Sequence, residues 1–212
     1  MRRANAQLQI DRRAEILSAA ERCFARAGFH QTSMQEVCAE ARMSPGNVYR
    51  YFASKEEIIA GICERNRAEV ARDFSLLESA PDFFTGLQGL ARYHLVERPA
   101  EEVALCAEIM AESRRNPDIA RLYRDCEQDV KGRLAQMLRH AAANGEIAAD
   151  LNVEHASTVL MALADGISWR RAVDGEFDAE AVLPMILRMV ECLLTRHGGT
   201  DAASPKEVSD EG

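Results

Sequence analysis

The sequence has no long apolar stretch and no sign of a secretion signal. No run of apolar residues approaches the roughly 18 residues that a membrane-spanning helix needs. The first five residues, MRRAN, are basic, but no apolar segment of the signal-peptide type follows them. We therefore expect a cytoplasmic protein with no membrane partner.

The sequence also lacks the patterns of metal centres and catalytic sites. Its six cysteines (23, 38, 63, 106, 126 and 192) form no C-x-x-C pair, and no histidine stands at metal-ligand spacing. There is no Gly-rich phosphate loop, nucleophile elbow or metalloprotease signature. We expect no catalytic residue, metal or cofactor, and reduced, mostly buried thiols.

Charge is unevenly distributed along an otherwise ordinary globular composition of 47% hydrophobic and 28% charged residues. The net charge is −8, but residues 1–55 carry nine Lys and Arg against five Asp and Glu, which is +4. The remaining residues carry −12. A basic end on an acidic body would turn the first segment toward nucleic acid and keep the rest away from phosphates.

Residues 32–55, TSMQEVCAEARMSPGNVYRYFASK, predict two short helices joined by a tight turn. The first has an apolar stripe at positions 34, 37, 38 and 41, and Ser33 with Glu36 forms a capping box. Ser44 and Pro45 are typical of the start of a second helix. Its inner face is sealed by Val48 and Phe52, which leaves amide, phenol and guanidinium groups outside. This pattern indicates a helix-turn-helix.

The same residues carry a family resemblance. Thr32-Ser33, the run 41–46 (ARMSPG) and Tyr49-x-x-Phe52-x-x-Lys55-Glu56 resemble the DNA-binding segment of tetracycline-repressor-like (TetR/AcrR) transcriptional regulators. The resemblance covers roughly residues 12 to 60. It implies an all-α protein with an N-terminal three-helix DNA-binding domain and a larger C-terminal helical domain for ligand binding and dimerisation. Arg42 stands where the family usually has glycine, so it must take a positive φ or shift the turn.

Helical periodicity and turn residues divide the chain into four parts. We expect a flexible arm at 1–11, the DNA-binding domain at 12–56, the effector-binding and dimerisation domain at 57–197, and a disordered acidic tail at 198–212. No segment alternates like a strand. Five helices are expected in the body after the connecting helix, at 81–97, 100–115, 117–144, 153–173 and 178–196.

The exposed residues of the helix-turn-helix divide by chemistry into two groups of candidate DNA contacts. Hydroxyl, phenol and ammonium groups suit phosphates, while amides, a guanidinium and close backbone approach suit base edges. The candidates for phosphate are Thr32, Ser33, Tyr49, Tyr51 and Lys55, and those for bases are Gln35, Pro45, Gly46, Asn47 and Arg50, with Ser44 beside them. The resemblance supports this division.

The last two expected helices carry apolar residues on more than one face, which requires cover on two sides. A second copy of the chain supplies that cover most simply, so we expect a homodimer through a four-helix interface. The interface candidates are Val159, Leu163, Ile167, Ile186, Met189, Val190 and Leu193. The alternative is that one subunit covers both faces itself.

The middle helices offer aromatic, sulfur-containing and polar side chains that suit either a cavity or a solid core. The candidates for ligand binding are Phe84, Leu87, His94, Cys106, Met110, Tyr123, Cys126 and Trp169. The resemblance favours a cavity for an apolar or amphipathic effector. It implies a homodimeric repressor released from palindromic double-stranded DNA when that effector binds.

Two alternatives remain open. One is thiol-based sensing through Cys23, Cys38, Cys106 or Cys126. The other is an all-helical enzyme or interaction module that does not bind DNA.

Overall fold

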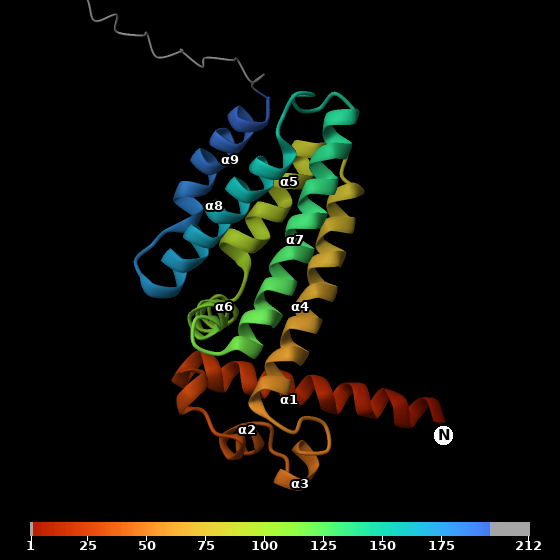
Figure 1. The fold of residues 1–212 in the computed structure, drawn as a ribbon, viewed down its shortest axis with the longest axis vertical. Helices are drawn as coiled ribbons and strands as arrows, with labels where there is room; N and C mark the ends of the chain where they lie inside the picture. Colours follow the sequence, from red (N-terminus) through yellow and green to blue (C-terminus); the bar gives the residue numbers. More distant parts are fainter. Residues whose placement is uncertain (1, 196–212) are drawn as a thin grey trace, which may run out of the picture.

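The computed structural model describes residues 2–195, which form helices and connecting turns with no strand among them. Figure 1 shows α2 and α3 at one end of the molecule below α1, and α5, α8 and α9 at the other end, with α7 beside α4 between them. Helix α4 (Lys55–Glu78) connects the two ends (Figure 1). The all-α prediction is confirmed, and the expected tail at 198–212 lies outside the described residues.

Helix α1 (Arg2–Gln31) begins well before residue 12, so our expectation of a flexible arm at 1–11 is wrong for residues 2–11. No glycine or proline precedes Gly28, and Gln7 Nε2 donates a hydrogen bond to Asp11 Oδ1 at 2.8 Å along the helix. The helix is interrupted at Gly28, where φ is 77° and ψ is 164°. This conformation is essentially restricted to glycine.

Helices α2 (Met34–Glu40) and α3 (Pro45–Val48) form the expected helix-turn-helix. Ser33 and Glu36 form the predicted capping box: Ser33 N–H donates to the Glu36 carboxylate at 2.6 Å, and Glu36 N–H donates to Ser33 Oγ at 3.2 Å. Phe24 of α1, Val37, Val48 and Phe52 are each at most 1% exposed in one core. As predicted, α1 is the third packing partner of the two short helices.

This first core extends beyond the helix-turn-helix into the body. It includes Ile58 and Ile62 from the first half of α4, Ile109 from α6 (Ala100–Ser113) and Ile119 from α7 (Pro117–Ala143). The second half of α4 instead contributes Phe74 and other residues to a second core. A division of the chain at residue 56 therefore separates sequence segments that share one hydrophobic core.

The second core lies between α4, α5 (Phe83–Arg92), α7, α8 (Val153–Val173) and α9 (Ala179–Thr195). The five expected helices of the body are confirmed, with ends shifted by a few residues. Helix α5 starts at Phe83 instead of residue 81 because the Asp82 carboxylate caps it and accepts from Thr85 N–H at 2.9 Å. It continues into a π-helical turn, η1 (Tyr93–Glu97).

Candidate nucleic-acid interface and ligand cavity

The outer surface of α2 and α3 presents most of the candidate base contacts to solvent. Gln35, Pro45, Gly46 and Arg50 are exposed, and Asn47 is half-buried. The Ser44 side chain is exposed and makes no capping hydrogen bond, although Ser44 occupies the N-cap position of α3. Its hydroxyl is thus available to a ligand.

Arg50 is positioned by an aromatic neighbour and keeps its charge uncompensated. Its guanidinium lies 5.6 Å from the centre of the Tyr51 ring. Tyr51 is half-buried and packs against the first core, which fixes the ring beneath the guanidinium. No ion pair within the described part of the chain involves Arg50. The ring of Tyr49 is 50% exposed on the same short segment.

The hydroxyls of Thr32 and Ser33, which we expected to contact a phosphate, both make hydrogen bonds within the protein. Thr32 is 1% exposed, and its hydroxyl oxygen lies 2.9 Å from the backbone carbonyl oxygen of Gly28 and 3.2 Å from that of Cys23, so its single O–H donates within the protein. Ser33 gives both its N–H and its hydroxyl to the Glu36 carboxylate. That carboxylate occupies the N-terminus of α2, the place expected for a phosphate, and these hydrogen bonds lower its pKa.

Lys55 is folded back against the protein as well. Its ammonium donates to the carbonyl of Phe29 at 2.6 Å and lies 4.4 Å from the centre of the Phe29 ring. The side chain therefore joins the start of α4 to the segment that follows the break in α1. An ammonium has three donors, so two remain for a phosphate.

Of the two possibilities for Arg42, a positive φ or a shifted turn, the structure shows the positive φ. Its φ is 54°, and it is the only residue other than glycine with a positive φ in the described range 2–195. The turn between α2 and α3 thus keeps the geometry that favours glycine, and the backbone of Arg42 carries the strain.

A cavity of about 290 Å³ lies in the body between α4, α5, α7, α8 and α9. Its walls are mainly apolar. They are formed by Val70, Phe74, Leu87, Leu90, Ala91, Leu95, Val130, Leu134, Leu160, Met161, Leu163, Ala164, Ile186, Leu187 and Val190, with His94, Arg98, Asp165 and Ser168 as polar members. Of the eight residues proposed for the pocket, Leu87 and His94 line this cavity.

The other six residues proposed for the pocket lie elsewhere. Tyr123 and Cys126 face the first core, and Trp169 is 48% exposed on α8. Phe84 packs on the second core outside the cavity lining. Cys106 and Met110 are half-buried on α6, which supplies no residue to the lining. An apolar stripe shows which face of α6 or α7 is covered, but it does not show which neighbour covers that face. Both helices also pack against the DNA-binding end.

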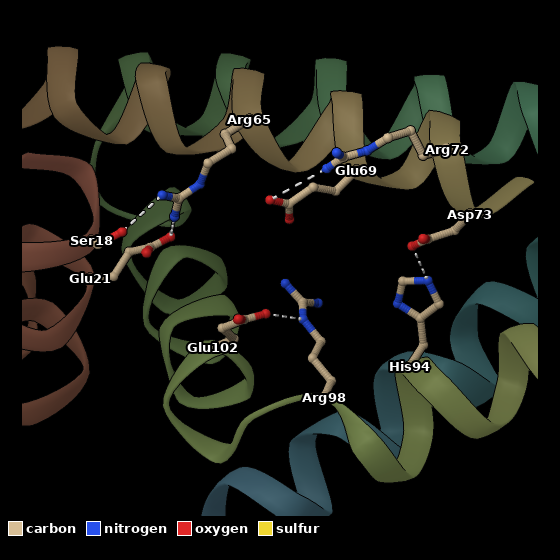
Figure 2. A network of polar contacts seen from close by, with 9 residues as sticks. All are labelled: Ser18, Glu21, Arg65, Glu69, Arg72, Asp73, His94, Arg98 and Glu102. Atoms are coloured by element: carbon tan, nitrogen blue, oxygen red, sulfur yellow. Dashed lines mark hydrogen bonds and ion pairs between the residues drawn. The ribbon is translucent and has the colours of Figure 1, made fainter. Parts of the chain in front are cut away.

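The polar part of the cavity lies on η1 and the residue that follows it. His94 Nε2 is 3.1 Å from Asp73 Oδ2 of α4, and Arg98 Nε donates to Glu102 Oε2 of α6 at 3.0 Å (Figure 2). Burial lowers the pKa of His94 despite the nearby Asp73, so the neutral imidazole is favoured. Arg98 was not among the residues predicted for the pocket, although it continues the helical stripe through Leu87, Leu90 and His94.

The thiols considered as redox sensors differ in their surroundings. Burial raises the pKa of Cys23, Cys38 and Cys106, which makes them poor nucleophiles. Cys126 differs because a hydrogen bond with Cys63, together with the Arg67 guanidinium, lowers its pKa. Its Sγ lies 3.8 Å from the carbonyl oxygen of Cys63.

The outer faces of α8 and α9 expose large apolar side chains. Val159 is 50% exposed, Met189 56% and Leu193 38%, and the unpredicted Met185 is 60% exposed. Ile167 is half-buried. Leu163, Ile186 and Val190 line the cavity, so these three candidates for the dimer interface point into their own subunit.

The described residues contain no cluster of side chains suited to a metal ion. None of the described helices combines the length and apolar character needed to cross a bilayer.

Comparison with known proteins gives a consistent family assignment. Residues 16–62 match the tetR family of bacterial regulatory proteins, and residues 92–195 match the C-terminal domain of BetI-type transcriptional repressors. The chain is 34% identical over 157 residues to the HTH-type transcriptional regulator UidR of Escherichia coli (strain K12), which covers 73% of this chain and 79% of UidR.

Solved structures show the same fold. GusR of Salmonella enterica superposes with a TM-score of 0.75 at 30% identity, covering 87% of this chain and 95% of GusR. The fatty acid degradation regulator FadR of Bacillus subtilis, solved with stearoyl-CoA, gives a TM-score of 0.76 at 18% identity, covering 85% of this chain and 98% of FadR. At that identity the similarity to FadR is one of fold.

Proposed function

Because this chain belongs to the tetR family of bacterial regulatory proteins, we propose that it is a homodimeric repressor that a small molecule releases from a palindromic operator. Regulators of this family are ligand-responsive DNA-binding repressors and not enzymes. A regulator that binds bacterial DNA works in the cytoplasm, and we propose that location for this chain.

The observation that carries the proposal is the exposed, uncompensated surface of α3 and the turn that follows it. Arg50, in that turn, offers a guanidinium without a carboxylate partner among the described ion pairs, and Gly46 presents bare backbone with nothing within 4 Å of the position of a Cβ. Asn47 and Tyr49 belong to the same segment, and Gln35 is exposed on α2. Such groups suit the major groove, where Arg pairs with guanine and amides pair with adenine.

The exposed apolar residues of α8 and α9 support a dimer. A second copy packed on Val159, Met185, Met189 and Leu193 would remove their side chains from water. One α3 reaches too few bases for specificity, and a two-fold axis would present two of them to half-sites one or more DNA turns apart.

Helix α6 provides a route from the cavity to the DNA-binding end. It starts beside the cavity residue Arg98 and packs along α1 near the break at Gly28. There Glu112, which is 2% exposed, lies 2.7 Å from His30 Nε2 of α1. We propose that an effector shifts α6 and, through this contact, the spacing of the two α3 helices, so that the effector and DNA favour different states.

Binding of labelled duplex DNA from upstream of the protein's own gene tests the proposal by fluorescence anisotropy. The full chain should bind it, and the affinity should fall steeply between about 50 and 200 mM salt, because Lys and Arg displace counterions. Arg50→Ala should relax base preference at one position per half-site, at roughly 1–3 kcal/mol. Arg139→Ala, on the far body, is the matched control. Weak binding that is equal on all sequences and in both variants would refute the proposal.

A further inference from the structure

The cavity has the size of a small molecule. Its volume of about 290 Å³ lies near the lower end of the range of small-molecule sites, roughly 300–1,000 Å³.

The cavity carries one firmly held cationic group, Arg98, in its lining. The backbone of Arg98 is fixed because its N–H donates to Tyr93 O at 2.8 Å and its carbonyl accepts from Arg171 Nη2 at 2.8 Å. Its side chain is 21% exposed. A guanidinium has five N–H donors. Among the described ion pairs, the one carboxylate partner of Arg98 is Glu102, which contacts Nε and leaves the two terminal nitrogens without a carboxylate.

The surrounding acidic groups do not take up the rest of the guanidinium. Asp73 is paired with His94, and Glu69 is paired with Arg72 at 3.9 Å (Figure 2). Asp165 is the acidic residue of the lining, and burial raises the pKa of its carboxyl, which favours the neutral form. His94 favours its neutral form as well.

We propose that the effector is a small amphipathic anion, with its carboxylate or similar group on Arg98 and its apolar part against Phe74, Leu134 and Leu160. That this site controls DNA binding rests on the proposed function, but binding of the anion to the site needs no DNA. The anion competes with Glu102 for Arg98. Because Glu102 belongs to α6, the exchange would loosen the tie between Arg98 and the helix that reaches α1.

Sodium octanoate is the probe; 1-octanol and octyltrimethylammonium are its neutral and cationic counterparts. Calorimetric titration of the full chain should show octanoate binding at least about tenfold more tightly than 1-octanol, the effect expected of a charge-assisted hydrogen bond. The cation should bind most weakly. Equal binding of octanoate and 1-octanol, stronger binding of the cation, or no binding of any probe would overturn the proposal.

Two variants and a control assign the effect to the charge. Arg98→Gln should abolish the preference for octanoate while leaving 1-octanol affinity unchanged, which also shows that the cavity is intact. Glu102→Gln should strengthen octanoate binding several-fold because it removes the competitor and keeps the side-chain shape. Arg139→Gln, whose partner Glu154 lies on the surface, should change nothing. Undiminished octanoate preference in Arg98→Gln, or weaker octanoate binding in Glu102→Gln, would contradict the assignment.

Failure of this inference differs from failure of the proposed function. Octanoate binding with the expected preference but without release of DNA supports the anion site and contradicts the role of the cavity as the effector site. DNA binding that is intact while 1-octanol or the cation is preferred overturns the anion site alone.

Discussion

Replacing Gly28 by alanine should destabilise the fold through the backbone. Gly28 has φ 77° and ψ 164°, a region in which a residue with a Cβ costs about 1–3 kcal/mol. The added Cβ would also lie 3.1 Å from Glu108 Oε2. That atom ends a flexible side chain that can move, so it adds little. We expect a loss of about 2 kcal/mol in the free energy of unfolding.

Urea unfolding followed by circular dichroism measures this loss. With a slope of about 2 kcal/mol per M for a chain of this size, the midpoint should fall by roughly 1 M at unchanged slope. Protein concentration must be equal for all variants, because the proposed dimer would make the midpoint depend on it.

Gly89→Ala is the matched control. Gly89 lies inside α5 with nothing within 4 Å of a Cβ, so alanine there should stabilise by about 0.5–1 kcal/mol. If Gly28→Ala has the same urea midpoint as the unmodified protein, the break in α1 does not require glycine.

Four further predictions follow from particular contacts. Arg42→Gly should raise stability by about 0.5–1 kcal/mol, because it relieves a left-handed residue with φ 54°; a lower urea midpoint would contradict this. Lys55→Met should lower stability by about 1 kcal/mol, through loss of the contacts with Phe29, and should weaken binding to all DNA sequences alike, whereas Lys55→Arg should retain most of both; sequence-selective loss would exclude a phosphate role. Met189→Glu should give monomers in sedimentation velocity, because it puts a charge on the exposed apolar face of α9; Gln136→Glu, at an exposed position of α7, is the control. A persistent dimer would place the interface elsewhere. Iodoacetamide should label Cys126 faster than Cys63 at pH 7, and the rate should fall as the pH drops through the pKa of Cys126 and protonates its thiolate; preferential labelling of Cys63 would contradict the lowered pKa of Cys126.

Local sequence signals predicted the helix-turn-helix well. The Ser33–Glu36 capping box, the proline that opens α3 and the break at Gly28 act over a few residues, so their geometry follows from residue type. The strain at Arg42 was predictable for the same reason. In contrast, the burial of Thr32 and the folding back of Lys55 depend on Cys23 and Phe29, which are distant in sequence and become neighbours only after packing.

The cavity was less predictable because several helices have two covered faces. Tyr123 and Cys126 were expected to line a ligand cavity, but they pack on the first core, because the helical periodicity of α7 does not specify which neighbour covers each face. On α9, Ile186 and Val190 face the cavity while Met185 and Met189 face outward. The position of α9 against α8, η1 and α5 decides which of its faces is covered.

Selection of binding sites from a pool of randomised duplex DNA, using the purified full chain, tests whether the chain recognises a palindromic operator as a dimer. We expect enrichment of a two-fold symmetric sequence, with half-sites separated by about one DNA turn or a multiple of it. Loss of one base preference in each half-site with Arg50→Ala would link that sequence to the segment formed by α3 and the turn after it. Recovery of a pool without any enriched symmetric sequence would contradict the account.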